Sequence, residues 1–186
     1  KAGSGFFAAN LDAYDPAEII EDLVLEAQSL AGERLHIAGL SLASASWDMD
    51  RYLAESALSN ALHNALRYAA GRIQISAHEE EGYLVLRVED DGPGYPATLL
   101  ECGAQPLPNG EQGSTGLGLT ISKMLTDLMG GEMTVHSQPA PPGAADEAGL
   151  RVGTVFRIRL FLPEVRAEVA DRALPHTQRS GYTGVR

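Results

Sequence analysis

Apolar residues recur at helical spacing in three segments of the chain. The first segment follows Asp15-Pro16, a pair typical of a helix start. Asp48 is the expected N-cap of the second, and Gly130-Gly131 is a strong stop signal for the third. The predicted helices cover residues 16–31, 48–70 and 116–128. The predicted core positions of the second helix are Leu58, Leu62, Ala65, Leu66 and Ala69.

Shorter segments with strand-like patterns lie between and after these helices. The predicted strands cover residues 35–42, 72–78, 83–90, 132–137 and 154–162. The order is helix, strand, helix, two strands, helix, two strands. This order predicts an α/β (α+β) two-layer sandwich, in which a mixed, mostly antiparallel sheet carries its helices on one face.

Two segments rich in Gly and Pro interrupt the pattern. Residues 91–115 show almost no periodicity, and a loop of this length in a compact domain is typical of a functional lid. Residues 139–150 are expected to form a solvated hairpin loop. Residues 164–186 lose the pattern and are interpreted as a linker or tail. One domain is therefore expected over residues 15–163, preceded by a linker over residues 1–14.

Charge and composition exclude several classes of function. The chain has 14 basic and 25 acidic residues and a net charge of −11, which argues against nucleic acid as a partner. No run of about 18 apolar residues is present, so no membrane contact is expected. One cysteine, Cys102, excludes an internal disulfide and fits a reducing cytosol. We therefore expect a cytoplasmic location, whether or not the full-length protein is anchored in a membrane.

A first candidate site lies on the second predicted helix. Asn60 and Asn64 are four residues apart on one side, and Arg67 and Tyr68 follow one turn later. Asparagine is unfavourable inside helices, so two in register need a reason. A carboxamide oxygen can bind Mg²⁺ and its nitrogen can donate to phosphate. Two solvated asparagines on an outer face are the alternative.

A second candidate is the carboxylate that ends the strand at residues 83–90. Asp90 is in phase with the apolar residues of that strand, although no donor for it is evident in the local sequence. The exocyclic amino group of adenine could satisfy it. Gly92 and Gly94 allow a sharp turn and leave room for a flat base. An ordinary Asp-Gly-Pro-Gly turn is the alternative.

A third candidate is the glycine-rich stretch that opens the last predicted helix. It supplies free N–H groups and a helix dipole that favour anions, and Ser114 and Thr115 add hydroxyl donors. It is not a Walker A loop, because no Gly-Lys-Ser/Thr follows, and no strand leads directly into it. A simple hinge is the alternative. The five histidines show no metal-ligand spacing.

The three stretches, in this order, resemble the N, G1 and G2 boxes of the ATP-binding domain of sensor histidine kinases. The wider family shares the Bergerat fold and includes type II topoisomerase and Hsp90-like ATPases. Asn-x-x-x-Asn-Ala followed by Arg67-Tyr68 is particularly kinase-like, as is Gly-Leu-Gly-Leu followed by Ile121 and Lys123. The resemblance covers residues 15–163. The opening Lys1-Ala-Gly also resembles the exit from a dimerisation helix.

The resemblance implies a role for each matching residue. Asn64 would bind Mg²⁺, Asn60 would act on the phosphate or metal side, Arg67 would face the phosphates and Tyr68 the nucleoside. Asp90 would accept from the adenine amino group, and Thr154 would reach adenine through water. The remaining pocket residues would be Gly92 and Gly94 beside the base, and Ser114, Thr115, Gly116, Leu117, Gly118 and Leu119 around the polyphosphate.

The first N-box position separates the subfamilies. The hydrolysing relatives carry a glutamate there, which activates water, whereas Asn60 cannot act as a base. The resemblance therefore implies an ATP-dependent protein-histidine kinase that transfers the γ-phosphoryl group. Its partners would be a dimerisation domain with the acceptor histidine and a response-regulator receiver domain. Catalytic work by Asn60 and Arg67 would be positioning and charge neutralisation.

Two departures from the family pattern, and one further resemblance at the end of the chain, bear on this expectation. The lid contains no Lys or Arg, both frequent there in the family. No His-Glu/Asp pair followed by the usual proline is present, so the chain is expected to be a catalytic fragment without the acceptor histidine. The ending, Gly181 to Gly184, resembles linkers before receiver domains in hybrid kinases. The alternatives are an anti-sigma-type serine kinase and a nucleotide-binding interaction module whose activity has decayed.

Overall fold

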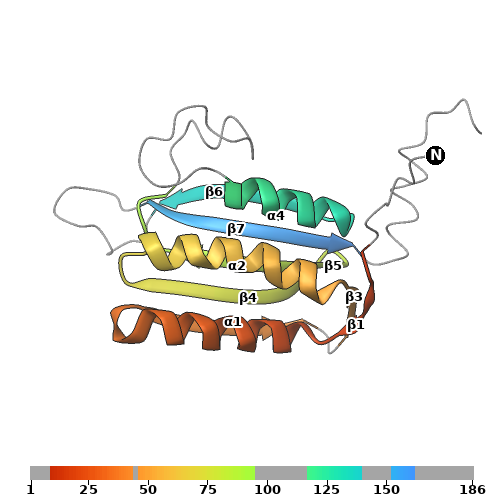
Figure 1. The fold of residues 1–186 in the computed structure, drawn as a ribbon, viewed down its shortest axis with the longest axis horizontal. Coiled ribbons are helices and arrows are strands. Elements are labelled where there is room, and N and C mark those ends of the chain that lie inside the picture. Colours follow the sequence, from red (N-terminus) through yellow and green to blue (C-terminus); the bar gives the residue numbers. More distant parts are fainter. Residues whose placement is uncertain (1–8, 44–45, 95–116, 140–151, 162–186) are drawn as a thin grey trace, which may run out of the picture.

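The computed structural model describes residues 9–43, 46–94, 117–139 and 152–161, and these residues form two layers (Figure 1). One layer contains the helices α1 (Pro16–Ala31), α2 (Arg51–Tyr68) and α4 (Leu117–Leu128). The other is a five-stranded sheet, and all three helices lie on the same face of it. The predicted two-layer sandwich is therefore confirmed.

The sheet is mixed, as the sequence predicted. Its strand order is β2-β4-β5-β7-β6, and only β2 and β4 pair in parallel. Helix α2 lies between β2 and β4 in the sequence, so it belongs to the crossover connection that a parallel pair requires. A single turn of 3-10 helix, Gly32–Arg34, separates α1 from β2. The strand bounds are β2 His36–Leu42, β4 Arg72–Glu80, β5 Tyr83–Asp90, β6 Glu132–Pro139 and β7 Val152–Phe161.

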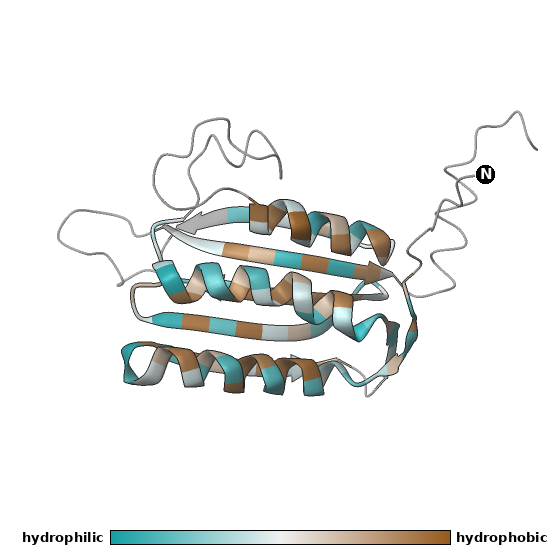
Figure 2. Cartoon of the chain, in the orientation of Figure 1, coloured by the Kyte–Doolittle hydropathy of each residue, from teal (hydrophilic) through white to brown (hydrophobic). Residues whose placement is uncertain are grey.

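The core fills the space between the helices and one face of the sheet. The predicted stripe of α2 is buried, with its leucines and alanines no more than 8% exposed. Figure 2 shows hydrophobic and hydrophilic residues alternating along β4 and β7, so each strand turns most of its apolar side chains toward the helices. The fully buried residues from both layers include Ile19, Leu58, Ile75, Leu86 and Ile158.

The start of α2 differs from the sequence prediction. Asp50 is its N-cap and accepts from the backbone N–H of Leu53 at 3.1 Å, so the expected cap at Asp48 was wrong. Asp48 instead lies in β3 (Trp47–Met49), which pairs with β1 (Asp12–Tyr14) in a two-stranded sheet. Trp47 and Met49 are buried on either side of exposed Asp48. Alternation over three residues is too short to register as a strand in the sequence.

The second face of the five-stranded sheet carries no helix among the described residues (Figure 1). Val85 and Val155 point to this face and are nonetheless 0% and 1% exposed. Three arginines on β5 and β7 also have buried Nε atoms, so their side chains lie close to the sheet instead of extending fully into water. These arginines are Arg87, Arg157 and Arg159, and each guanidinium pairs with a glutamate.

No helix in the part of the chain that the structure describes is long and apolar enough to cross a membrane. Residues 95–115 of the predicted lid, residues 140–150 of the predicted hairpin loop, Cys102 and the C-terminal tail lie outside the described residues.

The close approach of β7 to β5 can be tested with Gly153→Ala. A Cβ at Gly153 would lie 2.2 Å from the backbone oxygen of Asp90, so the strands must separate. We expect the free energy of unfolding in urea to fall by about 1–3 kcal/mol. Gly71→Ala is the control, because its Cβ would meet only Asp91 Oδ2 at 3.6 Å. Equal stability of the two variants would contradict the packing argument.

Candidate nucleotide-binding site

The two asparagines of α2 lie beside the first turn of α4. A Cβ added at Gly118 would stand 3.9 Å from Asn60 Cβ and 4.0 Å from Asn64 Nδ2. Asn60 and Asn64 are both half-buried rather than exposed on an outer face. The structure thus brings the first and third candidate stretches together, although their sequence positions differ by more than fifty residues.

A buried serine holds Asn60 in place. Asn60 Nδ2 donates to Ser122 Oγ at 3.4 Å, and Ser122 Oγ donates to the backbone oxygen of Ala57 at 2.9 Å. Ser122 is 0% exposed, as is Thr126 one turn later. Sequence reasoning did not single out Ser122. Its signal is the four-residue spacing of Gly118, Ser122 and Thr126, a narrow row of small residues within an apolar helix.

Arg67 and Tyr68 lie at the C-terminal end of α2, where the sequence placed them. The guanidinium carbon of Arg67 is 5.3 Å from the centre of the Tyr68 ring, close enough for a cation–π contact. Both side chains are exposed. In this arrangement the guanidinium group of Arg67 lies against the Tyr68 ring at the end of the helix.

Asp90 ends β5 and is half-buried on the helix-facing side of the sheet. Its Oδ1 accepts from the backbone N–H of Gly92 at 2.7 Å, and the backbone and hydroxyl of Thr154 also donate to the carboxylate. The expectation that no local donor exists was therefore wrong, because Gly92 is local and Thr154 comes from the neighbouring strand. Burial raises the pKa of Asp90 despite these donors.

The two glycines after Asp90 are required for different reasons. A Cβ at Gly92 would lie 2.6 Å from the backbone oxygen of Tyr68, so only glycine lets the loop pass the end of α2. Gly94 has a φ of 79°, in the left-handed region that glycine adopts without strain. The turn thus brings Asp90, Gly92 and the end of α2 into one corner.

Asp91, which sequence reasoning did not single out, closes this corner. Its Oδ1 accepts from the backbone N–H groups of Ala70, Gly71 and Arg72 at 2.9, 3.0 and 3.0 Å. Burial acts to raise the pKa of Asp91, but the backbone donors outweigh it and lower the pKa overall. No local sequence pattern predicts these contacts, because the donors precede Asp91 by about twenty residues.

The glycine-rich stretch is described only from Leu117 onward. Leu117 is exposed and Leu119 is buried at the first turn of α4. Ser114, Thr115 and Gly116 lie outside the described residues.

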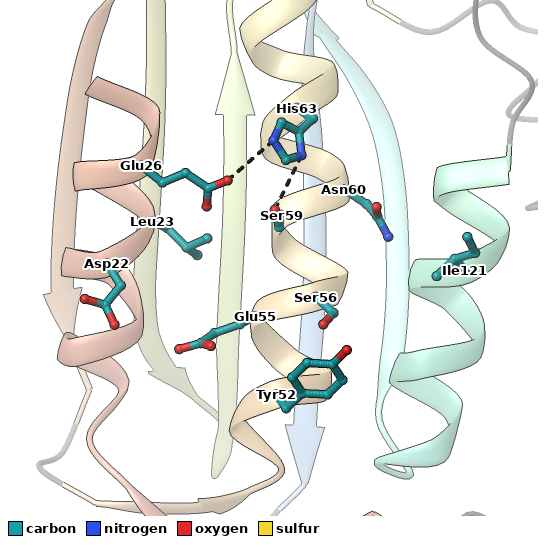
Figure 3. Close-up of a pocket in the computed structure, with 10 residues that line it drawn as sticks. All are labelled: Asp22, Leu23, Glu26, Tyr52, Glu55, Ser56, Ser59, Asn60, His63 and Ile121. Carbon is teal, nitrogen blue, oxygen red and sulfur yellow. Dashed lines mark hydrogen bonds and ion pairs between the residues drawn. The ribbon is translucent and has the colours of Figure 1, made fainter. Parts of the chain in front are cut away.

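A groove with a volume of about 490 Å³ runs over the outer surface of the helices (Figure 3). Asn60 and Ile121 line one side, and Asp22, Glu26 and Glu55 contribute carboxylates, although none of Asn64, Asp90 and Gly118 lines it. Three carboxylates repel phosphate, so this groove is not suited to a phosphate group.

His63 lines this groove. It lies on the side of α2 that faces away from Gly118. Figure 3 shows its ring directed toward Glu26 and Ser59, with its nitrogens 3.4 Å from each partner. This agrees with the expectation that His63 points elsewhere around the helix. Among the described residues, no group of three or more His, Cys, Asp or Glu is arranged to hold a metal ion.

The residues present nevertheless suit a Mg²⁺ ion that is shared with phosphate. Carboxamide oxygens are hard ligands of the kind that Mg²⁺ accepts, and this ion usually takes one or two protein ligands plus phosphate and water. Gly118 places no side chain beside the asparagines, and a Cβ there would be in ordinary van der Waals contact with them.

Comparison with known proteins identifies the family of the chain. Residues 49–164 match the family described as "Histidine kinase-, DNA gyrase B-, and HSP90-like ATPase". The match covers more than half of the chain, and the chain belongs to this family of ATP-binding domains.

Within the family, the chain is similar to sensor histidine kinases. It is 37% identical over 126 residues to the sensor protein TorS of Escherichia coli (strain K12), covering 60% of this chain and 11% of TorS. It is 32% identical over 165 residues to the C4-dicarboxylate transport sensor protein DctB of Rhizobium meliloti (strain 1021), covering 86% of this chain and 24% of DctB. The chain thus spans less than a quarter of each relative's length.

Solved structures of histidine kinases share the fold. Full-length ShkA in complex with AMPPNP gives a TM-score of 0.68 at 22% identity, covering 83% of this chain and 32% of ShkA. The catalytic domain of histidine kinase ThkA gives a TM-score of 0.67 at 19% identity, covering 84% of this chain and 99% of that domain. The prediction that the chain has the fold of a histidine-kinase catalytic domain is confirmed.

Asp91 gives a pH-dependent test of the corner. Because its folded-state pKa is lowered, its charged form stabilises the fold above its ordinary pKa of 3.8, and this contribution disappears as the pH falls through the folded value. Asp91→Asn should therefore be less stable than the wild type at pH 7, and the difference should shrink below about pH 4. Urea unfolding at several pH values measures it. A constant difference would contradict the assignment.

Proposed function

We propose that residues 15–163 bind Mg-ATP and supply its γ-phosphoryl group to a histidine on a separate dimerisation domain. The single observation that carries this proposal is the meeting of Asn60 and Asn64 with Gly118 at the first turn of α4. Amide side chains and the free N–H groups of a helix start then face the same space, which suits phosphate and its metal.

Asp90 is the proposed recognition group for adenine. Gly92 and Thr154 use part of its acceptor capacity, and a carboxylate offers about four lone-pair positions. The adenine amino group would take a remaining one. The raised pKa of Asp90 supports this role, because a carboxylate that burial disfavours gains from a further donor. Gly92 and Gly94 would leave space for the base, and Thr154 would contact it through water.

The phosphates would lie between α2 and the start of α4. Asn64 would offer its oxygen to Mg²⁺, with Asn60 beside it, and Arg67 would supply a positive charge. Tyr68 would flank the nucleoside. Ser114 to Leu119 would hold the polyphosphate through backbone and hydroxyl donors. A bound Mg²⁺ would neutralise charge on the phosphates during transfer.

The residue at the first N-box position favours transfer over hydrolysis. Asn60 has no basic atom with which to take a proton from water. Its contribution is positional, as is that of Arg67. The relatives are much longer than this chain, which supports a dimerisation partner in the same protein and a receiver domain as the next acceptor. Residues 1–14 and 164–186 would be linkers, and the reaction would take place in the cytoplasm.

Nucleotide binding is tested by calorimetry with Mg-AMPPNP. We expect Asp90→Asn and Asn64→Asp each to weaken binding at least about tenfold, because each removes or alters a charged or metal-bound contact. Glu89→Gln is the matched control, since Glu89 adjoins Asp90 but faces the other side of the sheet and pairs with Arg87. Undiminished binding by both site variants would refute the proposal.

The fragment alone should hydrolyse ATP far more slowly than about one turnover per second, because no base activates water. Phosphate release by the wild type and by Asn60→Glu measures this. Asn60→Glu introduces a carboxylate at the first N-box position, so this variant should hydrolyse ATP faster than the wild type. Rapid turnover by the wild type would contradict the assignment of Asn60.

A further inference from the structure

The hydrogen bonds of Ser122 determine which atom Asn60 turns toward α4. Ser122 Oγ carries one proton, and it lies 2.9 Å from the backbone oxygen of Ala57, which can only accept. That proton is therefore committed to Ala57. Toward Asn60, at 3.4 Å, Ser122 can act only as an acceptor. The atom of Asn60 that faces Ser122 must be its nitrogen, whichever way the amide is drawn.

One of the two N–H groups of Asn60 is used by Ser122, so the amide oxygen faces away from Ser122. Figure 3 shows the carboxamide projecting from α2 toward α4, with the nitrogen as the nearer atom. We propose that Ser122 is a positioning residue that fixes the Asn60 carboxamide with its oxygen directed to the metal side of the site. Asn60 then acts through its oxygen beside Asn64, while its second N–H group is not used by Ser122.

Packing alone does not require a hydroxyl at this position. Ser122 is 0% exposed between α2 and α4, where an alanine would fill nearly the same space. A buried hydroxyl is costly to desolvate unless its bonds are made. Here it makes two, and one of them ends on a residue of the candidate site. Gly118, one turn earlier on the same side of α4, lies beside Asn60 and Asn64.

This inference rests on the proposed nucleotide site, so its test has one measurement with nucleotide and one without. AMPPNP affinity is measured in saturating Mg²⁺ and in EDTA for the wild type and for Ser122→Ala. We expect Ser122→Ala to weaken binding in Mg²⁺ by about three- to tenfold, the effect of one lost hydrogen bond. Binding in EDTA should change by less than about twofold, because the asparagine oxygen matters only when metal is present.

Thr126→Val is the matched control, because Thr126 is equally buried one turn along α4 and its hydroxyl bonds only the backbone oxygen of Ser122. Its Mg²⁺ dependence should match the wild type. The double variant Asn60→Ala/Ser122→Ala should bind no more weakly than Asn60→Ala, since both act through one group. Equal losses in Mg²⁺ and EDTA, losses shared by Thr126→Val, or additive effects would overturn the proposal.

The nucleotide-free measurement is the side-chain amide NMR signal of Asn60, identified by its disappearance in Asn60→Ala. In the wild type the signal should be shifted from the position of a solvated amide. Ser122→Ala should return it toward that position, and Thr126→Val should not. An unchanged signal in Ser122→Ala overturns the proposal. A changed signal without AMPPNP binding by the wild type would instead refute the proposed function and the metal-side role, while keeping the Ser122–Asn60 bond.

Discussion

The arrangement of the site depends on one carboxylate that is not expected to touch a ligand. Asp91 gathers the backbone N–H groups of Ala70, Gly71 and Arg72, where α2 has ended and β4 begins. These three residues connect the end of the helix to the start of the strand. By accepting from all three, Asp91 joins the end of β5 to the end of α2. Asp90 is consequently held at a fixed position relative to the asparagines.

Close backbone contacts then make this corner tightly packed. Gly92 passes the last carbonyl of α2, and Gly153 passes the backbone of Asp90, at distances that no side chain allows. On the opposite side, the small residues of α4 let that helix approach α2. The polar groups of the site are thus positioned by glycines and by one buried serine, whose places in the sequence are far apart. The positions of these polar groups therefore depend on close packing, which small side chains make possible.

Sequence reasoning succeeded where the signal was local. The Asp15 cap and the apolar stripe of α1 lie within a few turns, and the predicted bounds agree with the structure at Pro16–Ala31. It failed where long-range pairing decides the outcome. Trp47–Met49 is a strand because Asp12–Tyr14 lies beside it. The donors to Asp90 and Asp91 come partly from other strands and from the helix end. The box residues could be proposed from the resemblance, but Ser122 became visible only through its contact with Asn60.

The face of the sheet that carries no helix among the described residues has a consequence for how the protein behaves among other molecules. An exposed apolar sheet face usually risks stacking onto another sheet. Here Val85 and Val155 are almost fully buried, and three arginines on this face pair with glutamates. Two such faces would have to remove water from these charged pairs before they could meet. The charged pairs therefore discourage aggregation through this face.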